Sequence, residues 1–145
     1  MHKITKIFLQ RFFPSLIILP FLACAGMKIG NLKETIDKYN KAIKWAGYAS
    51  TAGMIEEAER QAILEKKLKE MNDKNVVEYS LGDLSLSGDG KSATALVQYS
   101  LINQKYQSLE NSIELQLWKK IDGRWYLSKI INPNEKPQKG KHATP

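Results

Sequence analysis

The chain has 145 residues, of which 43% are hydrophobic and 26% charged, a composition that suits one globular domain and excludes a disordered or collagen-like chain. One cysteine and two histidines are too few for a disulfide framework or a zinc cage, so we expect no metal and no cofactor. The formal net charge is +7, but many of the surplus lysines and arginines lie at the two ends, and the middle is nearly balanced. We therefore predict no nucleic-acid binding.

Residues 1–23 have the order of an export signal: basic, then apolar, then small side chains. The uncharged run 12–27 is 16 residues long and contains two prolines. A membrane-spanning helix needs about 20 apolar residues. This favours a cleaved signal over a permanent span.

The tetrapeptide Phe21-Leu22-Ala23-Cys24 resembles the lipobox of bacterial lipoproteins, although that family usually has Leu and then a small residue where Phe21 and Leu22 stand. The resemblance implies that Cys24 is acylated and becomes the mature N-terminus, followed by a linker over residues 24–30. It also implies a lipid-anchored protein of the cell envelope, and Ala25 implies the outer membrane, facing the periplasm. The alternative is an ordinary signal or an uncleaved anchor.

Apolar residues at helical spacing predict two helices, from residue 32 to about 47 and from residue 54 to about 72. Asn31 followed by Glu34 has the spacing of a capping box at the start of the first helix. Glutamates begin the second helix and lysines end it. We interpret that order as a complement to the helix dipole, not as a site.

From Val76 the apolar period changes to two and predicts four strands in an antiparallel meander. The apolar residues stand at odd-numbered positions up to Leu81 and at even-numbered positions from Leu84. This change predicts a β-bulge near Gly82-Asp83. The inner face of the sheet is expected to carry Val77, Tyr79, Ala93, Ala95, Val97, Tyr99, Leu101, Ile113, Leu115, Leu117, Trp125 and Leu127.

The last hairpin admits two loop lengths. A two-residue loop at Asp122-Gly123 mixes apolar and polar side chains on both faces. A three-residue loop over 121–123 aligns Leu117 with Leu127 and gathers the apolar side chains on one face, so we predict the longer loop. Trp125 then points to the core, and Trp118 and Tyr126 point to the other face.

Two N-terminal helices packed on a curved four-stranded antiparallel sheet, an α+β class, resemble exported domains of the nuclear transport factor 2-like superfamily. The residues that carry the resemblance are 39–45 and 118–127, including the turn Asp122-Gly-Arg-Trp125. We assign residues 31–132 to this α+β domain and 133–145 to a disordered basic tail. The usual roll has a further short helix that this chain lacks, which leaves a cystatin-like or unrelated α+β layout open.

The resemblance implies that enzymes of this roll place an Asp, His or Tyr inside the cone. The inner positions predicted above include no carboxylate and no imidazole, which leaves Asp37 and Asp83 as candidate acid–base groups. We therefore predict a domain that is not an enzyme. The alternative is a small enzyme of the same roll that uses Asp37 or Asp83.

Aromatic side chains supply the remaining candidates for binding. Candidates for lining an apolar ligand pocket are Tyr39, Trp45, Tyr79, Tyr99 and Trp125. Candidates for an exposed partner surface are Trp118, Lys120 and Tyr126. Each group also suits plain structural roles in the core or on a half-covered sheet face. The predicted function is a membrane-held envelope protein that binds a partner protein or a small apolar ligand.

Overall fold

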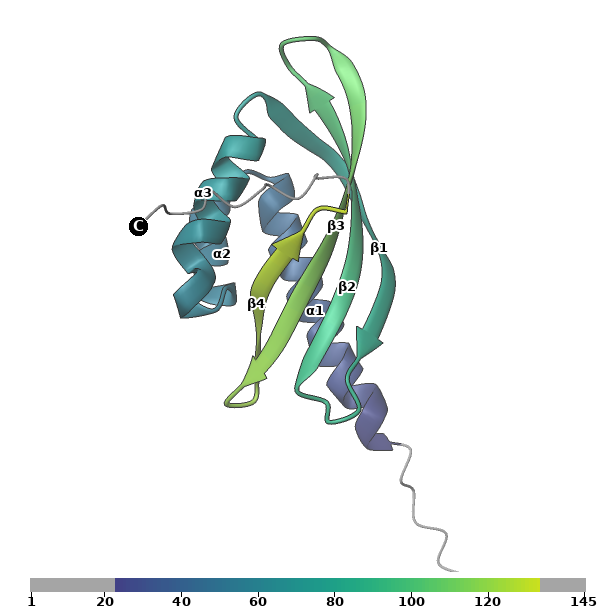
Figure 1. Cartoon of the computed structure of the whole chain (residues 1–145). Coiled ribbons are helices and arrows are strands. Elements are labelled where there is room, and N and C mark those ends of the chain that lie inside the picture. The colour runs from purple at the N-terminus through teal and green to yellow at the C-terminus, as the bar shows by residue number, and fades with distance from the viewer. Residues whose placement is uncertain (1–22, 134–145) are drawn as a thin grey trace, which may run out of the picture.

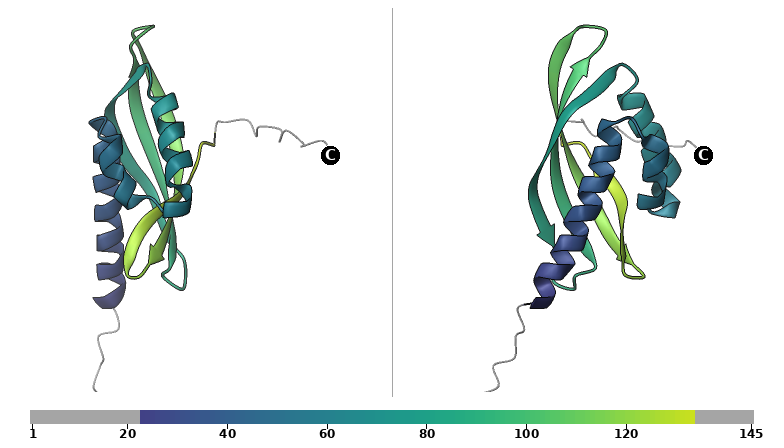
Figure 2. Two further views of the ribbon diagram at one scale, coloured as in Figure 1. Left: turned by 90° about the vertical axis from the view of Figure 1, so that its left-hand side faces the viewer. Right: turned by 180° about the vertical axis from the view of Figure 1, so that it is seen from behind.

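The computed structural model describes residues 23–133, so all but the first residue of the predicted tail and all but the last residue of the predicted signal lie outside the described residues. Its helical segments are α1 (Ala23–Lys44), α2 (Tyr48–Thr51), η1 (Ala52–Met54), η2 (Glu57–Glu59) and α3 (Arg60–Glu70). Its strands are β1 (Lys74–Leu86), β2 (Ser92–Asn103), β3 (Ser108–Ile121) and β4 (Arg124–Ile131). The strands form one antiparallel sheet in the order β1-β2-β3-β4. The described helices cover one face of this curved sheet (Figures 1 and 2), which confirms the α+β class.

Helix α1 lies across the sheet with an apolar stripe beneath it. Leu32, Ile36, Tyr39 and Ile43 are each at most 1% exposed, at the spacing of three and four that predicted the helix. The helix ends earlier than predicted, at Lys44, because Ala46 turns into the left-handed region with φ 53°. It also begins earlier, and its backbone runs through residues 24–30, where we predicted a linker.

The predicted second helix is divided into short segments instead of running from residue 54. Ile55 has extended backbone angles, is fully buried and forms a bridge with Leu127 of β4. The amide of Glu56 donates to the carbonyl of Leu127 at 2.9 Å. Burial of Ile55 and pairing with the sheet edge outweigh helix propensity here, because intrinsic propensity differs by less than about 1 kcal/mol between ordinary residues.

Strand β1 contains two bulges. The register shift between Leu81 and Leu84 confirms the bulge predicted at Gly82-Asp83. A second shift lies between Val76 and Glu78, where the sequence contains no glycine that would have indicated a bulge. This shift corrects the predicted inner face, because Val76 is buried whereas Val77 is 44% exposed.

The last hairpin has the two-residue loop, so the predicted three-residue loop is wrong. Ile121 pairs with Arg124, and Asp122 and Gly123 have φ values of 47° and 81°, as in a type I′ turn. A bulge between Leu117 and Trp118 then leaves one additional residue, Ser128, on β4.

This register reverses the predicted faces of β3. The buried side chains are Glu114, Gln116 and Trp118. The half-buried ones, on the opposite face, are Ile113, Leu115 and Leu117. Trp118 is 1% exposed and packs edge-on against Tyr39, with ring centroids 5.8 Å apart, so its predicted outward direction is also wrong.

Candidate functional site

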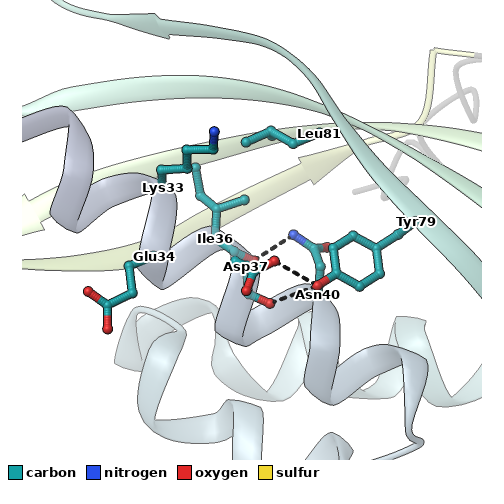
Figure 3. A pocket seen from close by; sticks show the side chains of 7 residues that line it. All are labelled: Lys33, Glu34, Ile36, Asp37, Asn40, Tyr79 and Leu81. Atoms are coloured by element: carbon teal, nitrogen blue, oxygen red, sulfur yellow. Dashed lines mark hydrogen bonds between the residues drawn. The ribbon is translucent and has the colours of Figure 1, made fainter.

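A pocket of about 550 Å³ opens between α1 and β1. That volume falls in the usual range of small-molecule sites. Its lining residues are Lys33, Glu34, Ile36, Asp37, Asn40, Tyr79 and Leu81 (Figure 3).

Local backbone geometry explains why these side chains meet. The α1 members recur at three and four residues, and side chains at that spacing share one helix face. On β1 the two bulges lie on either side of Tyr79 and Leu81. Bulges bend a strand and redirect its side chains, and this stretch of β1 faces α1.

Asp37 and Tyr79 form the polar end of the pocket. The Tyr79 hydroxyl donates to Oδ1 of Asp37 at 2.8 Å and approaches the Asp37 carbonyl at 3.4 Å. Partial burial, this hydrogen bond and the Asp37 charge raise the pKa of Tyr79 to about 12. Tyr79 therefore stays protonated at neutral pH and acts as a donor, while the exposed Asp37 carboxylate can accept a proton.

Asn40 fixes the floor of the pocket. It is 1% exposed, and its Nδ2 donates to the carbonyl of Ile36 at 2.7 Å. Its Oδ1 accepts hydrogen bonds from Gln116 Nε2, at 2.9 Å, and from the Tyr99 hydroxyl. These contacts join α1 to β2 and β3 and hold the helix face that carries Asp37.

A buried ion pair lies deeper between α3 and the sheet. Lys67 of α3 is fully buried and pairs with Glu114 of β3, which is 3% exposed. The Lys67 ammonium also lies 5.0 Å from the ring centroid of Tyr99. Among the described residues, Glu114 Oε2 and the Tyr39 hydroxyl have no hydrogen-bond partner. Burial, followed by the nearby Glu114 charge, raises the pKa of Tyr39 well above its ordinary value.

The five predicted pocket aromatics do not come together. Tyr79 lines the pocket, whereas Tyr39 and Tyr99 are fully buried beside it. Trp45 is 72% exposed just beyond the end of α1. Trp125 is buried and lines a separate pocket of about 310 Å³ near the last turn.

The predicted partner surface is also divided. Lys120 pairs with Trp125 across the strands, and its ammonium lies 5.7 Å from the Trp125 ring centroid. Lys120 and the buried Trp118 therefore share the face that the helices cover, and Tyr126, which alternates with Trp125 and Leu127, does not. The cause is the two-residue turn, which shifts β3 by one residue relative to the predicted register.

The structure separates the two candidate carboxylates. Asp37 lines the pocket, and Asp83 is exposed in the β1 bulge and does not line it. Sequence reasoning missed Lys33, Asn40 and Leu81. Asn40 carried a usable signal, because it is an amide within the apolar stripe of a helix.

Within residues 23–133, no group of three or more His, Cys, Asp or Glu side chains is arranged to hold a metal ion. None of the helices in this range has the length and apolarity needed to cross a membrane.

No family model matches the chain, and no curated protein matches it in sequence. Solved structures match it in fold. A SEC-C motif containing protein from Rhodopseudomonas palustris has a TM-score of 0.59 at 14% identity, covering 75% of this chain and 88% of that one. A candidate dehydratase of the NTF2-like family from Streptomyces avermitilis has a TM-score of 0.56 at 11% identity, covering 72% and 94%. An NTF2-like protein with a cystatin-like fold from Novosphingobium aromaticivorans has 0.52 at 12%, covering 78% and 86%.

The fold is therefore the cystatin-like α+β fold of NTF2-like proteins, as the sequence resemblance predicted. At these identities the likeness concerns the fold alone.

The prediction that the domain is not an enzyme is corrected. Proteins with this fold include the candidate dehydratase and a candidate polyketide cyclase from Xanthomonas campestris, with a TM-score of 0.51 at 10% identity. The premise of the prediction also fails, because the inner face of the sheet does carry a carboxylate, Glu114, and a second one, Asp37, lines the pocket. The premise fails because the two-residue turn reverses the predicted faces of β3 and places Glu114 on the inner face.

Proposed function

We propose that this domain binds a small organic molecule in the α1–β1 pocket and that Asp37 moves a proton on it as a general base. The observation that carries the proposal is the hydrogen bond from the Tyr79 hydroxyl to Asp37 Oδ1, made inside a pocket of ligand size. A candidate general base must be within reach of a bound molecule and held in a defined direction. The place of Asp37 in the pocket lining and its hydrogen bond with Tyr79 support this role.

Each neighbour of Asp37 has a separate role in this proposal. Tyr79 orients the carboxylate by donating to one oxygen, and the second oxygen accepts no hydrogen bond from the described residues. Ile36 and Leu81 supply apolar surface for the body of the ligand. Asn40 is a positioning residue, since it ties the helix to the sheet behind Asp37.

The proposed step is proton abstraction from a carbon next to a carbonyl group. The Asp37 carboxylate takes the proton, the electron pair of the C–H bond forms a carbon–carbon double bond, and the π electron pair of the carbonyl group moves onto its oxygen to give an enolate. Return of a proton from Asp37 to carbon restores the base. The candidate dehydratase with this fold supports this reaction class, because dehydration also requires removal of a proton.

Deuterium exchange tests the proposal without knowledge of the natural substrate. Purified protein is incubated in D₂O with pentan-2-one or with 4-oxopentanoate, and proton NMR follows the loss of the signals next to the ketone. We expect protein-dependent exchange that falls by about 10²-fold or more in Asp37→Asn, the usual contribution of a positioned general base.

Asp83→Asn is the matched control, because it removes the same charge from an exposed position that does not line the pocket. It should exchange deuterium at the rate of the unchanged protein. Exchange that is absent with both ketones, or that survives Asp37→Asn, overturns the proposal.

We also propose that acylated Cys24 holds the domain at the membrane of the cell envelope. The lipobox-like segment supports this location. The short distance along α1 from Cys24 to Lys33 would also place the pocket near the membrane. Lys33 follows Cys24 by nine residues of helix α1, or about 14 Å at 1.5 Å per residue. The experiment is fractionation of cells that express Cys24→Ser, which should lose acyl labelling and leave the membrane fraction. Unchanged membrane association contradicts the proposal.

A further inference from the structure

The pocket has two chemically different ends. Lys33 and Asp37 are separated by four residues on α1 and share one helix face, where such side chains lie about 5–6 Å apart at Cβ. Figure 3 shows the Lys33 ammonium extended toward Leu81, whereas Asp37 points to Tyr79 and Asn40. The side chain of Ile36 lies between the two ends.

The charges of the pocket are not equally engaged. Glu34 pairs with Lys38 at 2.7 Å, and Asp37 accepts the hydrogen bond of Tyr79. Lys33 makes no ion pair with any residue of the described range. Its ammonium group is therefore available to a bound molecule, next to an apolar wall.

We propose, on the basis of the proposed function, that the pocket selects small carboxylates. The carboxylate group of the ligand pairs with Lys33, its short apolar segment lies on Ile36 and Leu81, and its reacting carbon lies at Asp37. The separation of Lys33 and Asp37 along one helical turn matches a molecule in which a few bonds separate the acid from the reacting carbon.

An amine is the less suitable ligand for the same geometry. A ligand ammonium group next to Asp37 would form an ion pair with the base and occupy the oxygen that must accept a proton. A carboxylate at the Lys33 end leaves Asp37 free. The ligand class thus follows from the position of each charge, not from the net charge of the pocket.

Three probes of equal chain length test this selectivity. Hexanoate, hexan-1-ol and hexylammonium are titrated into the ¹⁵N-labelled full chain, and the amide shifts of residues 33–40 and 79–81 are followed by NMR. We expect hexanoate to bind about threefold to fivefold more tightly than hexan-1-ol, the gain typical of a solvent-exposed ion pair. This advantage should shrink as ionic strength rises.

Lys33→Gln should abolish the preference for hexanoate. The matched control is Lys41→Gln, which removes one charge from an exposed position of the same helix outside the pocket. It should keep the preference. Equal binding of hexanoate and hexan-1-ol to the unchanged protein, or tighter binding of hexylammonium, overturns the inference.

The outcomes separate this inference from the proposed function. Asp37→Asn should bind hexanoate at least as well as the unchanged protein, since a like charge is removed, while losing deuterium exchange. Exchange that depends on Asp37 but proceeds at equal rates for pentan-2-one and 4-oxopentanoate refutes the selection of carboxylates and leaves the proposed function intact. Absence of pocket shifts with all three probes overturns both proposals.

Discussion

Most half-buried strands turn apolar side chains to the core and polar ones to the other face, but strand β3 buries two polar side chains and leaves its aliphatic ones on the other face. Toward the helices it presents Glu114, Gln116 and Trp118. Away from them it presents Ile113, Leu115 and Leu117, which stay half-buried although none of the helices within residues 23–133 covers them. The inner polar groups are tolerated because α1 and α3 bring Asn40 and Lys67 to meet them. Burial on this sheet therefore follows the supply of partners, not hydrophobicity alone.

The largest test of this comparison is Trp118→Ala against Leu117→Ala. Trp118 is buried against Tyr39, so its loss should lower the free energy of unfolding by about 3 to 5 kcal/mol. Leu117 is half-buried on the other face, and its truncation should cost about 1 kcal/mol. Urea unfolding measures both values. Equal losses would mean that the faces are assigned wrongly.

Breaking the buried ion pair gives the next effect. Lys67→Met leaves Glu114 charged and unpaired in the core, and should lower the free energy of unfolding by about 3 kcal/mol. The double variant Lys67→Met with Glu114→Leu should recover most of that loss, because apolar side chains then fill the space. The exposed Lys69→Met is the control and should be nearly neutral. A double variant no more stable than Lys67→Met alone would contradict the account.

A smaller effect tests the turn that sets the two faces. Asp122 has a φ of 47°, so Asp122→Ala should cost about 1 kcal/mol in thermal or urea unfolding. Asp122→Asn should keep the full stability, since Asn adopts left-handed angles readily. If the two variants are equally stable, residue 122 does not have left-handed backbone angles, and the three-residue loop predicted from the sequence is favoured.

The smallest effect concerns Tyr79 at the edge of the inner face. Burial, the hydrogen bond to Asp37 and the Asp37 charge raise its folded pKa from 10.0 to about 12, so the protonated hydroxyl favours the folded state fully below about pH 10. That stabilisation is lost as pH rises from 10 to 12. Unfolding of the unchanged protein and of Tyr79→Phe should therefore differ by less than about 1 kcal/mol at pH 8 and converge near pH 12. A constant difference across this range would show that the pKa of Tyr79 is the same in the folded and the unfolded protein.

Local patterns in the sequence predicted much of the fold. The apolar stripe of α1, the alternation along β2 and the bulge at Gly82-Asp83 each follow from residues within a few positions of one another. The faces of β3 did not, because the two-residue turn puts Gln116 and Glu114 on the inner face, where they are tolerated only through partners from the helices. Asn40 and Lys67 lie more than forty residues earlier in the chain, on helices that the strand pattern does not describe.

The sequence predicted one residue of the candidate site, Asp37, but not the residues that surround it. Asp37 was a candidate from the sequence as one of two carboxylates. Its partner Tyr79 was assigned to an apolar pocket, because a tyrosine on a strand with alternating apolar residues indicates burial. That pattern does not indicate which group the tyrosine hydroxyl bonds, here Asp37. The meeting of Lys33 with Leu81 depends on how α1 crosses a doubly bulged strand, and no local pattern encodes that crossing.

The two outermost strands of the sheet are both unsuitable as templates for another chain. Regular edge strands expose a row of unpaired amides and carbonyls that a second β-strand can join. On β1 the bulges at Val77 and at Gly82-Asp83 break that row twice. On β4 the amide of Glu56 already occupies the carbonyl of Leu127. The same irregularities that shape the pocket and divide the second helix thus hinder edge-to-edge aggregation.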